Sequence, residues 1–239
     1  MVSIIIPSCK DKDLSKTVDD LYDKAESEIE IIVIENKPMR IAINEGVAKS
    51  KGEYIMKCDS HCMFGRGYDV KLLTDIEDNW VVIPRRYKLD TDKWEVIDEP
   101  PIDYMKIFVN DDKIGGVHWT NRRLEREEIM IDETMVFQGS CWLMTRKHWD
   151  WLGGLQIEGY GTFTQEPIEI ALKTWLGGGK VMVNKLTWYA HKHRKFGRTV
   201  APCSRKEINE GNAYSRDFWL NNRWDKRIHN IDWLFKKFK

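Results

Sequence analysis

VSIIIPS, the stretch Val2–Ser8, carries a β-branched apolar run that ends at a proline. Residues Val2–Ile6 are typical of a parallel strand that is buried on both faces. Two further apolar runs follow, IEIIVI at Ile29–Ile34 and EYIMKC at Glu53–Cys58. The N-terminal quarter of the chain therefore contains three predicted strands.

Helical patterns separate these strands at Leu14–Ser27 and at Ala42–Lys49, and Gly52 ends the second. Because strand and helix alternate at this spacing, we predict a βαβαβ unit with parallel strands and right-handed crossovers. Ligands of such sheets bind beyond the carboxyl ends of the strands. We therefore expect one site at which three loops meet: Ser8–Lys10, Glu35–Lys37 and Asp59–His61.

Downstream, the pattern continues around a less regular insert at Pro100–Glu133, which is rich in charged and aromatic residues. No internal repeat or low-complexity linker interrupts it. We predict one α/β domain over residues 1–239 with a mostly parallel central sheet. It comprises a nucleotide-binding half (1–84), an acceptor and metal half (85–200) and a basic C-terminal helical segment (201–239). The further elements expected are strands at Val81–Pro84, Thr134–Thr145 and Lys180–Asn184, and helices at Arg146–Leu152 and Glu166–Trp175.

Composition narrows the class of protein. Hydrophobic residues make up 42% of the chain, enough to bury a core. The 38 Lys and Arg residues balance the 38 Asp and Glu residues, so net charge alone indicates no polyanionic partner, although basic residues outnumber acidic ones from Lys185 onward. The N-terminal apolar run is too short for a signal peptide or a transmembrane segment. The five cysteines lack a CxxC spacing, so we expect reduced thiols in a cytoplasmic protein.

The sharpest chemical signal is Asp59-Ser60-His61, directly after the third strand. In an extended chain a carboxylate and an imidazole two residues apart point to the same side, and both bind divalent cations such as Mn²⁺. The alternative is a turn-capping aspartate beside an ordinary surface histidine, because D-x-H alone is a weak motif.

A second histidine cluster, His191 and His193, follows another predicted strand. A metal site needs ligands from separate segments, so His191 is a natural third ligand. The rival interpretation is a solvated basic loop, and the two combine if Arg194 and Lys195 face a diphosphate.

Longer stretches form an ordered series that covers most of the chain: VSIIIPS at Val2–Ser8, EIIVIEN at Glu30–Asn36, SKGEYIMKCDSHC at Ser50–Cys62, VVIP at Val81–Pro84, GGVHW at Gly115–Trp119, TMVFQGSCWLMTRKHWDWLGG at Thr134–Gly154, QEPIEIALKTWLGGGK at Gln165–Lys180 and WYAHKHRK at Trp188–Lys195. In this order they resemble the catalytic domain of the polypeptide N-acetylgalactosaminyltransferases and, more loosely, the broad family 2 glycosyltransferases. The resemblance implies a GT-A fold, which is a Rossmann-like nucleotide-diphospho-sugar transferase domain. It also implies a sugar transfer from a UDP-sugar to an acceptor hydroxyl that depends on Mn²⁺ or Mg²⁺.

The resemblance also assigns roles to single residues. It implies that Asp59, His61 and His191 hold the metal and that Glu35 contacts the uracil. The catalytic candidates are Glu166 and Glu169, which stand where the family reads W-G-G-E-N-x-E, and Arg194. The residues expected to bind the donor are Pro7, Ser8, Lys10, Glu35, Asn44, Asp59, Ser60, Trp119 and Lys195.

One departure bears on the mechanism. Inverting GT-A enzymes commonly carry an aspartate base after the glutamate at position 166, and this chain has Pro167 there. The N-acetylgalactosaminyltransferases have asparagine and retain the anomeric configuration. We therefore expect a retaining transfer in which a phosphate oxygen takes the acceptor proton, with Glu169 as an alternative base.

The acceptor and the function class stay open. The lectin domain and membrane anchor of the animal enzymes have no counterpart, which argues against a secretory polypeptide acceptor. A lipid-linked saccharide, a cytosolic protein and hydroxymethylated DNA, as for a phage or bacterial enzyme, are the candidates.

A nucleotidyltransferase is an alternative that would need a glycine-rich loop at Ser8–Lys10, and a non-catalytic sugar- or nucleic-acid-binding module is another. The basic C-terminal segment predicts a closing helix that could also contact nucleic acid or a membrane surface, from the helical spacing of Trp224, Ile228, Ile231, Phe235 and Phe238.

Overall fold

The computed structural model describes residues 1–192 and 204–239. Its strands are β1 (Val2–Ser8), β2 (Ile29–Glu35), β3 (Tyr54–Cys58), β4 (Cys62–Phe64), β5 (Trp80–Asp90), β6 (Glu95–Val96), β7 (Met105–Val109), β8 (Ile114–His118), β9 (Ile131–Glu133), β10 (Cys141–Thr145) and β11 (Lys180–Lys192). Its helices are α1 (Leu14–Lys24), α2 (Met39–Lys49), α3 (Tyr68–Lys71), α4 (Thr120–Glu125), α5 (Arg146–Leu152), α6 (Glu166–Leu176), α7 (Arg205–Leu220) and α8 (Ile231–Lys237).

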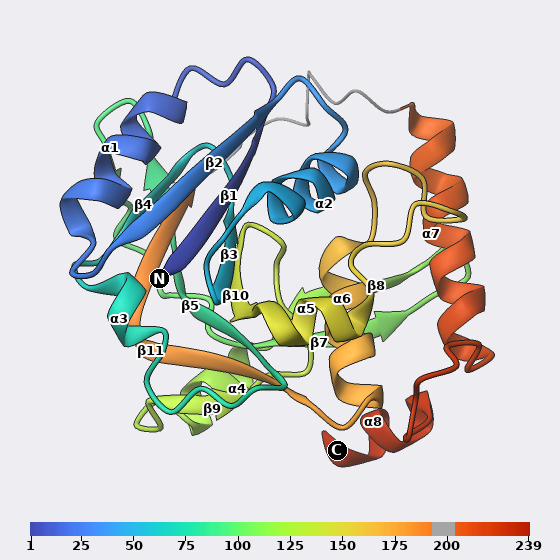
Figure 1. Cartoon of the computed structure of the whole chain (residues 1–239). Coiled ribbons are helices and arrows are strands. Elements are labelled where there is room, and N and C mark those ends of the chain that lie inside the picture. The colour runs from blue at the N-terminus through green and yellow to red at the C-terminus, as the bar shows by residue number, and fades with distance from the viewer. Residues whose placement is uncertain (193–203) are drawn as a thin grey trace.

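One mixed sheet organises the described residues (Figure 1). Its strand order is β2-β1-β3-β10-β5-β11-β4, with β6 beside β5 and β9 beside β11. β1 pairs in parallel with β2 and β3, and β5 pairs in parallel with β11. β10 runs antiparallel between β3 and β5. The predicted α/β class, with its βαβαβ unit and largely parallel sheet, is confirmed.

Helices cover both faces of the sheet, and successive residues of a strand point to opposite faces. In β1, Ile5 belongs to a hydrophobic cluster that also takes in α2, α5, α6 and α8. Its neighbours Ile4 and Ile6 belong to a second cluster, with α1 and α3. All three isoleucines are fully buried, which explains why this strand is an unbroken apolar run.

Two strands are longer than the sequence indicated, and their extra length shapes the site. β11 continues from Asn184 through an irregularity to Trp188 and on to Lys192. This extension places His191 opposite Cys62 of β4 and Lys88 of β5. β5 likewise runs without a break through residue 84, and the division into two halves at that point stays a prediction.

The insert at Pro100–Glu133 is more regular than expected. It contains the β7–β8 hairpin, α4 and β9. The hairpin turns at Asn110, whose side-chain oxygen accepts hydrogen bonds from the backbone N–H of Asp112 at 3.1 Å and of Lys113 at 2.9 Å. An asparagine followed by polar residues is typical of such a turn, and this sequence signal for the hairpin was missed. The expected strand at Thr134–Thr145 is shorter, because only its last residues form β10.

The closing helix at the C-terminus is shorter than the sequence predicted. α7 ends at Leu220, Asn222 adopts a left-handed conformation with φ 52°, and α8 begins only at Ile231. At the start of α7, the Ser204 hydroxyl accepts a hydrogen bond from the Glu207 N–H at 3.1 Å, a serine cap that the S-x-x-E pattern encodes. Trp224 and Ile228 lie in the connection between the helices, so only the spacing of Ile231, Phe235 and Phe238 marks α8 and its C-terminal end. Among the helices described, none is both long and apolar enough to cross a membrane.

Candidate metal centre

Three side chains converge where β3 ends and β11 passes the β3–β4 loop. Asp59 Oδ2 lies 3.1 Å from His191 Nε2 and 3.9 Å from His61 Nε2, and the two Nε2 atoms are 3.1 Å apart. Two atoms bound at right angles to one cation, each about 2.1 Å from it, are about 3 Å apart. The three atoms therefore have nearly the spacing of ligands on one face of a divalent cation.

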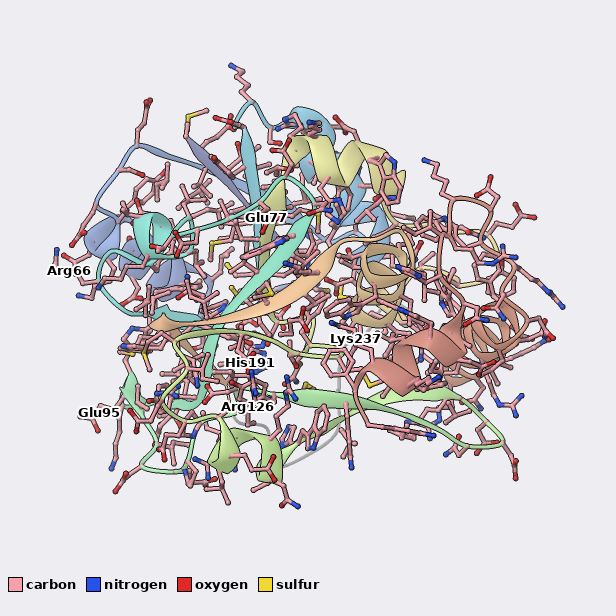
Figure 2. All side chains as sticks on the ribbon, turned by 90° about the horizontal axis from the view of Figure 1, so that it is seen from below. Arg66, Glu77, Glu95, Arg126, His191 and Lys237 are labelled. Atoms are coloured by element: carbon pink, nitrogen blue, oxygen red, sulfur yellow. The ribbon has the colours of Figure 1, made fainter. Side chains whose placement is uncertain are left out.

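The backbone fixes this geometry. The Asp59 N–H donates to the Ser140 carbonyl at 3.0 Å, which ties the loop to the residue before β10. The Lys192 N–H donates to the His61 carbonyl at 3.1 Å, which continues the β4–β11 pairing into the loop. Figure 2 shows His191 in the interior of the view, whereas the labelled Arg66 and Glu95 lie at its rim. The cluster is thus held by strands on both sides.

Asp11, a residue that the sequence analysis did not single out, orients His61. Its Oδ2 lies 2.7 Å from His61 Nδ1 and accepts a hydrogen bond from the Ser60 hydroxyl at 3.0 Å. Burial raises the pKa of Asp11, but the hydrogen bonds from His61, from the Asp13 N–H and from Ser60 outweigh it and hold the pKa below its ordinary value. A carboxylate that takes the Nδ1–H of a histidine leaves the Nε2 lone pair facing a metal. The position of Asp11 just after the first strand was the sequence signal that could have identified it.

Lys57 holds the second oxygen of Asp59. Its ammonium group is buried and donates to Asp59 Oδ1 at 2.6 Å, and it lies 3.9 Å from Glu166 Oε2. Burial raises the pKa of Asp59, but the charge of Lys57 and the hydrogen bond with His191 outweigh it and hold the pKa well below its ordinary value. Asp59 is therefore an anion with Oδ2 directed at the two histidines.

Burial keeps His191 in the neutral form that binds metals. It lowers the pKa of His191 to about 4, although the Asp59 carboxylate opposes the shift. His191 Nδ1 is buried and has no hydrogen-bond partner among the described residues. The centre thus combines the neutral ring of His191 with the anionic carboxylate of Asp59.

The other residues predicted at the strand ends lie at the same end of the sheet. The Ser8 carbonyl accepts a hydrogen bond from the Asn36 N–H at 2.9 Å, so the loops after β1 and β2 meet as expected. Pro7 pairs with Ile34 in the parallel register, Ser8 is buried, and Lys10 and Glu35 are exposed. The Asp11 contacts with Ser60 and His61 connect the loop after β1 to the loop after β3.

Glu169 and Asn44 lie apart from the cluster, with their polar groups already used. Glu169 pairs with Arg40 and with Lys173, whose ammonium group is 2.7 Å from Oε1, and it also accepts the Gln156 N–H at 3.1 Å. Both ends of the Asn44 amide bind the Leu155 backbone, at 2.8 and 3.0 Å. Their functional roles stay predictions.

Trp119 lies beside the start of α4, with its ring centroid 6.1 Å from that of Phe238. Glu166 is buried next to Lys57 and accepts the Trp142 indole N–H at 2.5 Å, and burial raises its pKa above its ordinary value. The positions proposed for His193, Arg194 and Lys195 fall outside the described residues.

Two basic residues of β5 approach the cluster and were not predicted. Lys88 is the register partner of His191, and Arg86 is the partner of Tyr189 two residues earlier. Partners on parallel strands point to the same face, so both cations lie on the face that carries His191. The Arg86 charge contributes to the low pKa of His191 after burial.

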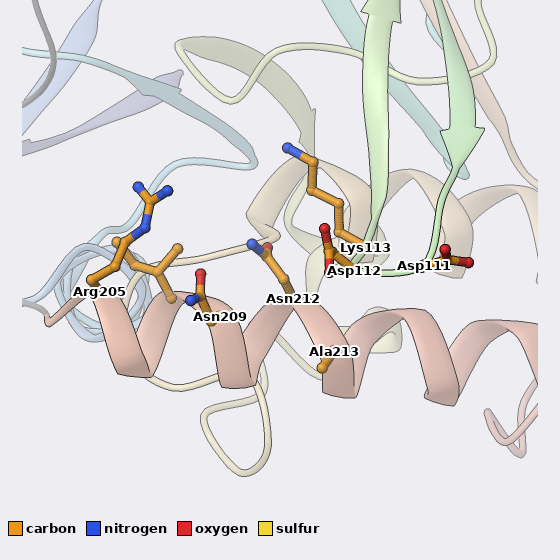
Figure 3. A pocket seen from close by; sticks show the side chains of 8 residues that line it. Asp111, Asp112, Lys113, Arg205, Asn209, Asn212 and Ala213 are labelled. Atoms are coloured by element: carbon orange, nitrogen blue, oxygen red, sulfur yellow. The ribbon is translucent and has the colours of Figure 1, made fainter.

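Away from the metal centre, a pocket of about 610 Å³ lies between the tip of the β7–β8 hairpin and α7 (Figure 3). Asp111, Asp112 and Lys113 of the hairpin face Arg205 and Asn209 of the helix across it. Acidic and basic residues are both present in the lining, so its charge favours neither anionic nor cationic ligands.

Comparisons with known proteins agree with this arrangement. No protein-family model matches the chain. A Drosophila melanogaster protein named "Putative polypeptide N-acetylgalactosaminyltransferase 13" is 30% identical over 166 residues, which cover 64% of this chain and 27% of that protein. A crystal structure of GalNAc-T7 with UDP, GalNAc and Mn²⁺ superposes with a TM-score of 0.71 at 16% identity, over 93% of this chain and 48% of that one. The chain thus spans about a quarter of the curated relative and about half of the solved structure. Its fold is the GT-A fold, and it resembles the catalytic domains of the polypeptide N-acetylgalactosaminyltransferases.

Proposed function

We propose that this chain is a metal-dependent glycosyltransferase that moves a sugar from a UDP-sugar to an acceptor hydroxyl. The observation that carries the proposal is the cluster of Asp59, His61 and His191 at the carboxyl ends of the strands of a GT-A fold. A metal and a nucleotide-sugar would therefore meet where open α/β sheets bind their ligands.

The three side chains fit Mn²⁺ better than Mg²⁺. Two imidazoles and one carboxylate suit a borderline transition metal, whereas Mg²⁺ prefers an all-oxygen shell. Bound there, the ion would neutralise the negative charge that develops on the diphosphate as it leaves. Lys57 and Asp11 would keep the carboxylate of Asp59 and the ring of His61 in place.

The donor would lie across the ends of β1 and β2. Ser8 and Glu35 stand at those ends, and Glu35 is exposed, as a uracil-binding carboxylate must be. We assign Arg194 and Lys195 to the diphosphate on the basis of the sequence resemblance. The cytoplasmic location and the phage or bacterial origin stay predictions from the sequence.

We propose a retaining transfer. The bond from the anomeric carbon to the diphosphate oxygen breaks, the bond to the acceptor oxygen forms on the same face, and the hydroxyl proton passes to the leaving phosphate oxygen. Asp11, Asp59 and Glu166 each already accept a hydrogen bond from a neighbouring side chain. A carboxylate free to act as a base is therefore lacking among these three.

The test is UDP release from a panel of UDP-sugars, measured with Mn²⁺ and with EDTA. We expect Mn²⁺-dependent release from one donor, lost in Asp59→Ala and kept in Asp78→Ala, where an exposed aspartate pairs with the exposed Lys147. Failure of UDP–Mn²⁺ to bind the wild-type protein would contradict the proposal. The anomeric proton coupling of the product, read by NMR, decides between retention and inversion.

A further inference from the structure

A pocket of about 290 Å³ opens beside the metal centre, on the β5 side. It lies between β5, the segment that follows β6, the end of β8 and the start of α4. Lys88, the register partner of His191, connects it to the centre. Its lining includes the charged residues Lys88, Glu99, Asp103 and Arg123 and the histidine His118.

The lining is more positive than its residue types suggest. Asp103 receives two hydrogen bonds from Arg85, at 2.8 and 2.9 Å, so its charge is already balanced. Glu99 pairs with Lys88, but the Lys88 side chain is 28% and that of Glu99 46% exposed, and partly exposed pairs are weak enough for a stronger anion to compete. The Arg123 side chain has no ion-pair partner within residues 1–192 and 204–239.

His118 reports this positive field. Burial lowers its pKa first, and the charges of Arg86 and Lys88 lower it further. Two cations that lower the pKa of a neighbouring imidazole would also stabilise an anion bound beside it. His118, Lys88 and Arg123 thus offer three donors around one opening.

Position separates this pocket from the proposed donor site. Most of the proposed donor residues stand on or just after β1 and β2, at one end of the strand order, and β5 lies on the other side of β3 and β10. Trp119, which the sequence predicted to bind the donor, lines this pocket and is assigned here to the acceptor. The metal centre draws on both sides, because Asp59 follows β3 and His191 lies on β11, which pairs with β5. An anion in this pocket would consequently approach the reacting atoms from the acceptor side.

We propose that this pocket binds a phosphate group carried by the acceptor, and that the acceptor is a phosphorylated saccharide. This inference rests on the proposed glycosyltransferase function. The volume suits one sugar ring with its phosphate and is too small for a nucleic-acid duplex. Trp119 and Tyr104 line the same pocket and supply apolar ring surfaces against which a sugar can pack.

The test uses NMR of the histidine imidazoles, with His118 assigned from His118→Gln. Inorganic phosphate, glucose 6-phosphate and glucose are titrated separately at constant ionic strength. We expect saturable shifts of His118 and a raised pKa with the two phosphates, and no saturable shift with glucose. Lys88→Gln and Arg123→Gln should each weaken phosphate binding roughly tenfold, since each removes one charge-assisted hydrogen bond. The exposed control Arg66→Gln should leave it unchanged.

Absence of a saturable shift, or equal weakening in Arg66→Gln, would overturn the proposal. The titration is repeated with UDP–Mn²⁺ bound and is then followed by calorimetry, because Mn²⁺ broadens the signals of nearby histidines. Glucose 6-phosphate that still binds supports an acceptor site, whereas competition with UDP–Mn²⁺ would assign the positive charge to the donor diphosphate and overturn it. Failure of Mn²⁺ to broaden the His61 and His191 signals would contradict the proposed function instead, and the phosphate titration would still be read independently.

Discussion

Glu166 and Glu169 stand one turn apart on α6, and both are almost fully buried, but they belong to two different kinds of charged cluster. Glu169 has cations on both oxygens, Arg40 on one and Lys173 on the other. Glu166 lies toward the metal centre, where Lys57 is shared with Asp59. In the first cluster two cations serve one carboxylate, whereas in the second one cation serves two carboxylates.

The difference shows what a buried charge indicates. In the Arg40–Glu169 cluster the backbone completes the contacts, because Arg40 also donates to the carbonyls of Gln156 and Thr164. Nothing there calls for a ligand. At the metal centre, Asp59 Oδ2 and two histidine nitrogens face one another, and His191 Nδ1 lacks a partner among the described residues. Burial alone does not identify a site, but a carboxylate oxygen and two imidazole nitrogens directed at one point do.

The largest expected effect follows from breaking the complete cluster. Glu169→Gln leaves Arg40 buried without its anion, which should cost about 3–5 kcal/mol of the free energy of unfolding. Mn²⁺ affinity should stay unchanged, because Glu169 lies outside the centre. Denaturant unfolding and Mn²⁺ titration of the same variant check both statements. A stable variant with weakened Mn²⁺ binding would show that the distinction between the clusters is wrong.

A buried histidine outside the centre gives the next effect. Burial lowers the pKa of His148 to about 4 from the ordinary 6.5, and its Nε2 lies 3.0 Å from the Thr174 hydroxyl. As pH falls between these values, the unfolded chain takes up a proton that the folded protein refuses. Stability should therefore be full above about pH 6.5 and decrease by about 3 kcal/mol toward pH 4. Unfolding curves across this range should show a shallower decrease for His148→Gln, and an unchanged slope would refute the assignment.

A smaller effect sharpens the description of the incomplete cluster. Asp11→Asn removes the carboxylate that orients His61, so Mn²⁺ affinity should fall by about 10- to 100-fold. The matched control is Asp78→Asn, a change at an exposed aspartate, which should have no effect. Mn²⁺ titration measures both. Equal affinities of the two variants would mean that Asp11 does not position His61.

The contrast between the clusters also marks the limit of sequence reasoning. Apolar runs predicted β1, β2 and β3, and the place of Asp59 and His61 after β3 predicted the centre, because local pattern determines where a strand ends. Arg40 and Glu169 are 129 residues apart and no local pattern connects them. Lys57 stands two residues before Asp59 in a predicted strand, so their contact was a local signal that was overlooked, whereas its second bond, to the Gly139 carbonyl, connects distant parts of the chain.

The cations near the centre were missed for a similar reason. Lys88 comes beside His191 only through the register between β5 and β11, which the sequence does not specify. The S-x-x-E cap of α7, by contrast, was present in the sequence and was overlooked. Long-range register and long-range ion pairing therefore separate what was predicted from what was not.

The most direct test compares two buried histidines, His191 in the centre and His148 outside it, each with a pKa lowered to about 4 by burial. Electron paramagnetic resonance counts the Mn²⁺ bound by the wild type, His191→Gln and His148→Gln. We predict one tightly bound ion per chain in the wild type and in His148→Gln, and loss of that ion in His191→Gln. A wild type that binds no Mn²⁺, or a His191→Gln variant that binds it as tightly, would contradict the assignment of Asp59, His61 and His191 as a metal centre.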